Sequence, residues 1–146
     1  RGNLKELGSV GADELDALIL PGGFGAAKNL SNFAFEGTNM SVDENLEKLI
    51  QGMRAADKPM GFICIAPAIA AKVLGEASPQ LTIGNDPDTA AALKSMGAKH
   101  VDCPVDEIVV DERLKVVSTP AYMLGPSIAP VAKGIDKLVE KVISYL

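Results

Sequence analysis

Short apolar runs alternate with amphipathic stretches along this chain, the pattern of buried strands joined by crossover helices. The first run, Asp16–Leu20, is apolar after its aspartate and predicts a strand buried on both faces. The Pro21-Gly22-Gly23 segment follows and cannot continue a hydrogen-bonded ladder. The runs at Met60–Ile63 and Leu81–Gly84 predict a second and a third strand. This order of runs favours an α/β fold with a mostly parallel sheet.

Amphipathic segments fill the intervals between the strands. Ser41-Val42-Asp43-Glu44 has the form of a capping box, in which the Ser41 hydroxyl and the Glu44 carboxylate each satisfy a free amide at a helix start. A second helix follows Pro67, and a third runs from a cap at Asp86 to Gly97. A fourth helix is predicted to begin near Ser127. Its predicted inner face consists of Ile128, Val131, Ile135, Leu138, Val139 and Val142.

Two apolar runs near the end of the chain predict a β-hairpin, so the sheet is expected to be mixed. They are Ile108–Val110 and Lys115–Val117, on either side of Asp111–Leu114. The predicted order lacks the opening βαβ unit of a typical open sheet, and the chain begins at Arg1. We therefore expect residues 1–146 to form one domain that lacks its N-terminal portion.

Composition narrows the classes of function. Hydrophobic residues make up 47% of the chain and charged residues 23%, an ordinary globular balance. The net charge of −5 argues against a nucleic-acid partner, and no apolar run reaches the roughly 18–20 residues of a membrane span. Two cysteines and one histidine make neither a disulfide framework nor a zinc pattern. We expect no metal, no membrane association and a reducing, cytoplasmic location.

Cys64 carries the strongest chemical signal, because it stands between a predicted buried strand and a helix. Chemistry in open α/β sheets gathers at the carboxyl ends of strands, and a helix start favours the reactive thiolate. A sharp turn there would present the thiol to a cleft, as a nucleophile elbow does. The amides of Ile65, Gly22 and Gly23 could then stabilise an oxyanion. The alternative is that Cys64 is a small buried hydrophobic residue.

Other candidate residues carry weaker signals. His100 is expected to be structural or solvent-facing rather than catalytic. Cys103, flanked by Asp102, is expected to be an unreactive structural thiol. Thr119 and Tyr122 follow a strand end and could line a pocket. The acidic residues around the hairpin are interpreted as a solvated edge that blocks strand pairing; they are Asp106, Glu107, Asp111 and Glu112. The glycines at 22, 23 and 25 do not match GxGxxG, so no dinucleotide cofactor is expected.

Several motifs, in order, resemble one known group of proteins. Pro21–Leu30 (PGGFGAAKNL) and Gly61–Pro67 (GFICIAP) look like the ThiJ/PfpI superfamily, and closely resemble its ElbB branch of amidotransferase-like proteins. Leu81–Gly84, Met96–His100 and Thr119–Met123 continue the likeness. The resemblance covers nearly the whole chain.

The resemblance implies a flavodoxin-like, class I glutamine amidotransferase-like three-layer sandwich with Cys64 as the nucleophile. It also implies a cytoplasmic homodimer that converts small dicarbonyls to hydroxy acids without a cofactor. A glutamate of the opening strand-to-helix turn would tune the cysteine, but that segment would precede Arg1. Several relatives place a histidine near the third strand, where this chain has Asn85-Asp86.

Three functions follow as hypotheses. The first is a cofactor-independent lyase or hydratase of the glyoxalase type, acting on small aldehydes such as glyoxal. The second is cysteine-dependent hydrolysis or amide transfer, which normally needs a Cys–His couple. The third is a non-enzymatic redox-sensing or partner-binding domain in which Cys64 is oxidised.

Overall fold

A four-stranded sheet forms the centre of the computed structural model, which describes residues 2–146. The strand order is β1-β2-β6-β5, in which the first three are parallel and β5 is antiparallel to β6. The strands are β1 (Leu18–Leu20), β2 (Met60–Ile63), β5 (Val109–Asp111) and β6 (Val116–Thr119). The predicted strand at Met60–Ile63 and the predicted hairpin are confirmed. The first strand is shorter than predicted because Asp16 and Ala17 lie outside the ladder.

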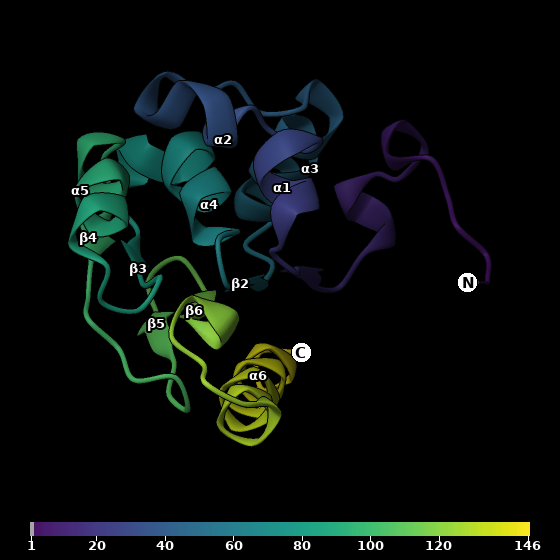
Figure 1. The fold of residues 1–146 in the computed structure, drawn as a ribbon. Helices are drawn as coiled ribbons and strands as arrows, with labels where there is room; N and C mark the ends of the chain where they lie inside the picture. Colours follow the sequence, from purple (N-terminus) through teal and green to yellow (C-terminus); the bar gives the residue numbers. More distant parts are fainter. Residues whose placement is uncertain (1) are drawn as a thin grey trace.

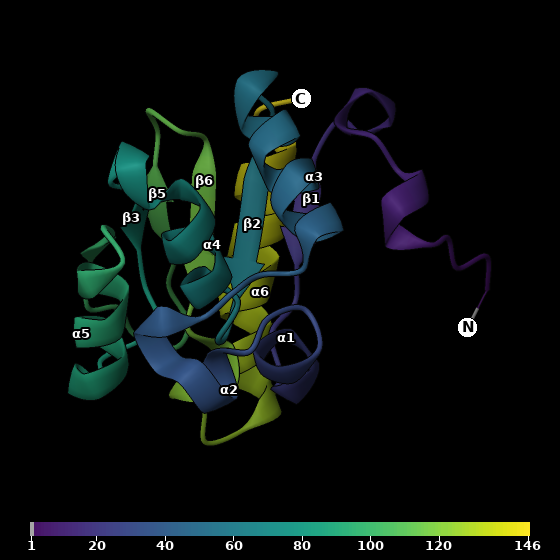
Figure 2. The same ribbon diagram turned by 90° about the horizontal axis from the view of Figure 1, so that it is seen from above.

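Helices cover both faces of this sheet, which gives the predicted three-layer arrangement. Figures 1 and 2 show α6 alone on one face and α3, α4 and α5 on the other. Figure 2 also shows α1 and α2 at the end of the sheet toward which β2 points. The α-helices are α1 (Phe24–Lys28), α2 (Phe33–Glu36), α3 (Glu44–Ala55), α4 (Pro67–Leu74), α5 (Pro87–Ser95) and α6 (Ile128–Ile143). The 3₁₀ turns are η1 (Leu7–Ser9), η2 (Ala12–Glu14), η3 (Gly37–Asn39), η4 (Gly75–Ala77) and η5 (Ala121–Met123).

The caps of two helices test the sequence interpretation. Asp43, not Ser41, caps α3, and its side chain accepts from the amides of Asn45 and Leu46. The Ser41 amide instead donates to Asn32 Oδ1, so the predicted capping box is wrong. A carboxylate two or three residues before the free amides reaches them directly. Its negative charge is also stabilised by the positive end of the helix dipole. Asp86 caps α5 as predicted, accepting from the Thr89 amide.

The third predicted strand is only partly regular. β3 (Gln80–Leu81) is two residues long and pairs in parallel with β4 (Lys99–His100), which the sequence did not indicate. Thr82, Ile83 and Gly84 continue past β3 as irregular but buried backbone. This small second sheet is joined to the main one through Asp111, whose Oδ2 accepts from the Gln80 amide at 2.9 Å. Asp111 is 4% exposed, so it does not belong to a solvated edge as predicted.

The core lies on both sides of the main sheet. Phe62, Met53 and Ile69 pack between the sheet and α3 and α4, while Leu138 and Val142 of α6 pack against the opposite face. Ile128 is 75% exposed, so its predicted place on the inner face of α6 is wrong. It is the first residue of the helix. In the part of the chain that the structure describes, no helix is both long and apolar enough to cross a bilayer.

Candidate functional site

Cys64 occupies a sharp turn between β2 and α4. Its φ is +65°, a left-handed conformation that a residue with a side chain adopts at a cost. The turn is held at both ends, because the Cys64 amide donates to the Thr119 carbonyl at 3.0 Å and the Ala66 amide donates to the Ile63 carbonyl at 3.1 Å. The side chain is half-buried. This backbone has the strained geometry that is typical of nucleophile elbows.

The glycine segment after β1 lies against this turn. A Cβ built on Gly22 would stand 2.8 Å from the Cys64 Cβ and 2.9 Å from the Ile65 nitrogen. Only a residue without a side chain allows such an approach. Gly23 has a φ of +90°, and the space around it is open. The structure therefore brings Gly22, Cys64 and Ile65 together at the shared end of β1 and β2.

Three backbone amides at the ends of β1 and β2 have no hydrogen-bond acceptor in the part of the chain that the structure describes. Within residues 2–146, the amides of Gly22, Gly23 and Ile65 donate no hydrogen bond to another protein group. Pro67 begins α4 and has no amide hydrogen to compete with them. An arrangement of a thiol and unpaired amides can stabilise the oxyanion formed when sulfur adds to a carbonyl.

A second strained residue follows the neighbouring strand. Ala121 has a φ of +46° and is 1% exposed, at the start of the turn after β6. Left-handed residues that are not glycine concentrate at functional sites. Cys64 and Ala121 thus mark the ends of two adjacent parallel strands. No sequence signal identifies Ala121, because alanine ordinarily favours the right-handed region.

The two predicted pocket residues have different surroundings. Thr119 is fully buried, and its hydroxyl donates to the Glu107 carbonyl at 2.8 Å. Its carbonyl, rather than its side chain, faces the elbow by accepting from Cys64. Tyr122 is 61% exposed, so its ring is accessible from solvent. Thr119 therefore shapes the elbow through its backbone, and Tyr122 is the more accessible of the two.

Cys103 is set apart from Cys64 by its environment. It is 5% exposed, and its thiol donates to the Pro104 carbonyl. Burial, together with the nearby charges of Glu107 and Asp106, raises the pKa of the Cys103 thiol to about 11. At neutral pH this cysteine is a thiol, as predicted, but through burial and the charges of Glu107 and Asp106 rather than through the flanking Asp102.

His100 is engaged by neighbours other than the cysteine. Its Nε2 accepts from the Ile83 amide at 3.3 Å, and its Nδ1 lies 3.5 Å from Asp102 Oδ1. Burial lowers the pKa of the His100 imidazole, an effect that the charge of Asp102 opposes and that of Lys94 reinforces. The imidazole is therefore neutral at pH 7, with both nitrogens directed at these partners.

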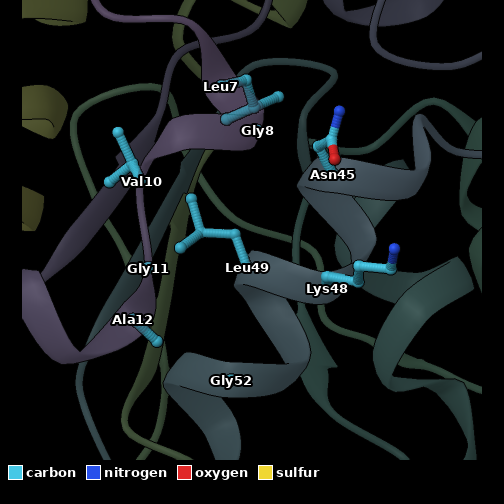
Figure 3. Close-up of a pocket in the computed structure, with 9 residues that line it drawn as sticks. All are labelled: Leu7, Gly8, Val10, Gly11, Ala12, Asn45, Lys48, Leu49 and Gly52. Carbon is cyan, nitrogen blue, oxygen red and sulfur yellow. The ribbon is translucent and has the colours of Figure 1, made fainter.

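Two further features lie outside the predicted site. Phe24 and Phe35 are largely exposed, and the Lys28 ammonium lies 4.5 Å and 5.4 Å from the centroids of their rings. A cavity of about 260 Å³ separates the N-terminal segment from α3, where Leu7, Val10 and Leu49 line it (Figure 3). None of the elbow residues lines that cavity. Among the residues that the structure describes, no cluster of His, Cys, Asp and Glu could hold a metal ion.

Comparison of the chain with known proteins finds relatives that are described as amidotransferase-like. No family model matches the chain. The human protein "Glutamine amidotransferase-like class 1 domain-containing protein 3, mitochondrial" is 41% identical over 152 aligned positions, which cover 98% of this chain and 56% of that protein. The chain is a homologue of the glutamine amidotransferase-like class 1 domain proteins. It spans little more than half the length of this human relative.

Solved structures agree with this assignment. This chain superposes, with a TM-score of 0.84, on an isoprenoid biosynthesis protein with an amidotransferase-like domain from Ehrlichia chaffeensis. The two are 32% identical, and the match covers 96% of this chain and 64% of that one. Drosophila melanogaster DJ-1β shares the fold, with a TM-score of 0.60 at 22% identity, over 94% of this chain and 65% of that one. The predicted flavodoxin-like, amidotransferase-like fold is confirmed.

Proposed function

We propose that Cys64 is the nucleophile of a cofactor-independent, glyoxalase-type reaction that converts small reactive aldehydes to hydroxy acids, with glyoxal to glycolate as its simplest case. The observation that carries the proposal is the left-handed Cys64 at the end of a buried strand, in contact with Gly22. Membership of a superfamily that contains enzymes with a catalytic cysteine supports it.

The proposed reaction needs few groups. The Cys64 thiolate adds to one carbonyl carbon of glyoxal, a C–S bond forms, and the carbonyl π electrons move to oxygen. The amides of Ile65, Gly22 and Gly23 would hold that oxyanion until it is protonated to a hemithioacetal. Unpaired amides fixed by the backbone suit this role, since they need no rearrangement as the charge develops.

The second half of the reaction is an internal oxidation and reduction. A base removes the hydrogen of the hemithioacetal carbon as a proton and a proton is delivered to the neighbouring carbon, which leaves a glycolyl thioester on Cys64. Water then cleaves the C–S bond and releases glycolate and the thiol. One carbon is oxidised as the other is reduced, so no external oxidant is required. By its family resemblance, the base would be a glutamate from a segment that these residues do not include.

Amide hydrolysis or transfer is the second candidate, which the names of the relatives favour. That chemistry ordinarily uses a Cys–His couple. The single histidine of the chain is directed at Ile83 and Asp102, which weighs against such a couple. If neither the glyoxalase-type reaction nor amide hydrolysis or transfer depends on Cys64, a redox-sensing or partner-binding role becomes the preferred hypothesis.

We also propose an ElbB-like, homodimeric and cytoplasmic protein, in keeping with the motifs quoted above. The name of the human relative places that protein in mitochondria, which makes the mitochondrion the alternative location. Sedimentation equilibrium tests the dimer, and fractionation of cells that express the protein tests the location. The function itself is tested by glycolate formation from glyoxal, which must depend on Cys64 and not on Cys103.

A further inference from the structure

His100 is buried in a way that fixes its protonation state. Its side chain is 1% exposed, although the chain around it is at the surface. Because Nε2 accepts the Ile83 amide proton, that nitrogen carries no hydrogen, and Nδ1, which faces Asp102, carries the ring proton. Protonation of the ring would place a hydrogen on Nε2, so that it could no longer accept a hydrogen bond from the Ile83 amide.

The segment that His100 holds has no regular pairing of its own. Thr82 and Ile83 are fully buried, but they lie beyond the end of β3. The Thr82 amide donates to Ser118 Oγ at 2.9 Å, and the Gly84 amide donates to Thr82 Oγ1 at 2.9 Å. Side chains thus satisfy all three amides in succession. Loss of one acceptor would leave a buried amide unpaired, which is costly.

This segment is linked to the elbow through β6. Ser118, which accepts from Thr82, precedes Thr119, whose carbonyl accepts from the Cys64 amide at 3.0 Å. The strained Cys64 conformation depends on such surrounding contacts. Three hydrogen bonds, joined by the Thr82–Ile83 and Ser118–Thr119 segments, therefore connect the imidazole to the cysteine.

We propose that His100 is a positioning residue for Cys64. Its neutral imidazole holds Ile83, and through Thr82 and Ser118 it steadies the strand end whose carbonyl fixes the elbow. Protonation of His100 breaks the bond to Ile83 and lowers the reactivity of Cys64. The inference rests on Cys64 as the proposed nucleophile but not on the identity of the substrate.

The charged groups that face His100 set the pH range of this effect. Asp102, in the loop after β4, raises the pKa of the imidazole, whereas Lys94 of α5 lowers it. Burial is the largest effect, and together with Lys94 it outweighs Asp102 and holds the pKa of His100 below its ordinary value. The neutral, positioning form therefore prevails at pH 7, and the loss occurs in acid.

The experiment compares Cys64 alkylation by iodoacetamide in the parent chain and in His100→Gln from neutral to acidic pH. Glutamine keeps an oxygen acceptor for the Ile83 amide and does not titrate. The Cys64 thiol is present in both proteins, so the pH dependence of its own ionisation cancels in the ratio of the two alkylation rates. We expect the parent-to-variant ratio to fall on the order of two- to thirtyfold as His100 is protonated. The midpoint should coincide with the imidazole titration measured by NMR, where the only histidine of the chain gives an unambiguous signal.

Asp102→Asn provides a second variant that retains the imidazole. Removal of the carboxylate should move both the NMR midpoint and the loss of alkylation to lower pH, because Asp102 raises the His100 pKa. Hydrogen exchange at the Ile83 amide should accelerate with the same midpoint. A ratio that stays flat through the imidazole titration, or a midpoint that Asp102→Asn does not lower, would overturn the inference while leaving the nucleophile intact. Preferential alkylation of Cys103 would instead refute the proposed nucleophile.

Discussion

Gly22 lies so close to Cys64 that a Cβ on the glycine would stand 2.8 Å from the Cβ of the cysteine. The same atom would lie 2.5 Å from the Ile63 carbonyl oxygen and 2.9 Å from the Ile65 nitrogen. Backbone atoms cannot move aside as the end of a flexible side chain can. The glycine is therefore a requirement of the elbow, and it sets the distance between the ends of β1 and β2.

Substitution of Gly22 by alanine should separate these two strand ends. We expect Gly22→Ala to lower the free energy of unfolding by about 1–3 kcal/mol through overpacking, and to slow Cys64 alkylation. Gly25→Ala, in α1, is the matched control, since its added Cβ meets only Asn29 Nδ2, at 3.9 Å. Urea unfolding and alkylation kinetics measure both effects. Equal behaviour of the two variants would contradict the close approach.

The left-handed conformation of Cys64 predicts an unusual order of stability among its variants. Cys64→Gly should be more stable than Cys64→Ala by about 1 kcal/mol, because only alanine is strained at a φ of +65°. At an ordinary position glycine would be the less stable of the two. Urea unfolding of both variants, neither of which keeps the thiol, gives the comparison. A more stable alanine variant would show that the elbow is not strained.

Cys64 and Cys103 should differ in their reaction with a small electrophile. With a pKa of about 11, only roughly 10⁻⁴ of Cys103 is thiolate at pH 7, and the residue is 5% exposed. We expect Cys64 to be modified first near neutral pH, and Cys103 to react appreciably only in alkaline solution or after unfolding. Labelling followed by peptide mass spectrometry locates the modified thiol. Faster modification of Cys103 in the folded chain would refute the assignment.

Asp111 should contribute to stability because it joins the two sheets. Its carboxylate accepts from the amides of Gln80 and Leu114, and it lies 3.5 Å from Arg113. Asp111→Ala removes the acceptor of a partly buried amide and should cost about 1–3 kcal/mol of unfolding free energy. Asp136→Ala, at an exposed position on α6, is the control and should change stability little. Equal losses in the two variants would show that this link is not stabilising.

Local chemistry determined which parts of the fold were predictable from the sequence. The strand at Met60–Ile63 and the helix after Asp86 have signals within a few residues, namely an apolar run after Pro59 and a cap before Pro87. The cap of α3 was misassigned because Ser41 and Asp43 are both favourable caps, and only the folded backbone selects one. β4 went undetected because Lys99 and His100 have no apolar pattern.

The site was predictable in outline only. The Cys64 elbow follows from a strand, a turn and a helix in sequence, and the nearby glycine segment follows from parallel strands that end at the same edge. The contacts of His100 with Ile83, and of Asp111 with Gln80, join segments that the sequence separates. Such pairs depend on tertiary packing, so the sequence gives no signal for them.

The most direct test of the account is the amount of glycolate formed from glyoxal, measured by chromatography, because any exposed thiol consumes aldehyde reversibly. The assay contains no metal, nicotinamide or thiol cofactor. It uses protein that includes the segment with the proposed glutamate base, and compares this parent with its Cys64→Ala and Cys103→Ala variants. We expect slow glycolate formation by the parent and by Cys103→Ala, and none above background by Cys64→Ala. Glycolate formation by Cys64→Ala at the rate of the parent would contradict the proposed function.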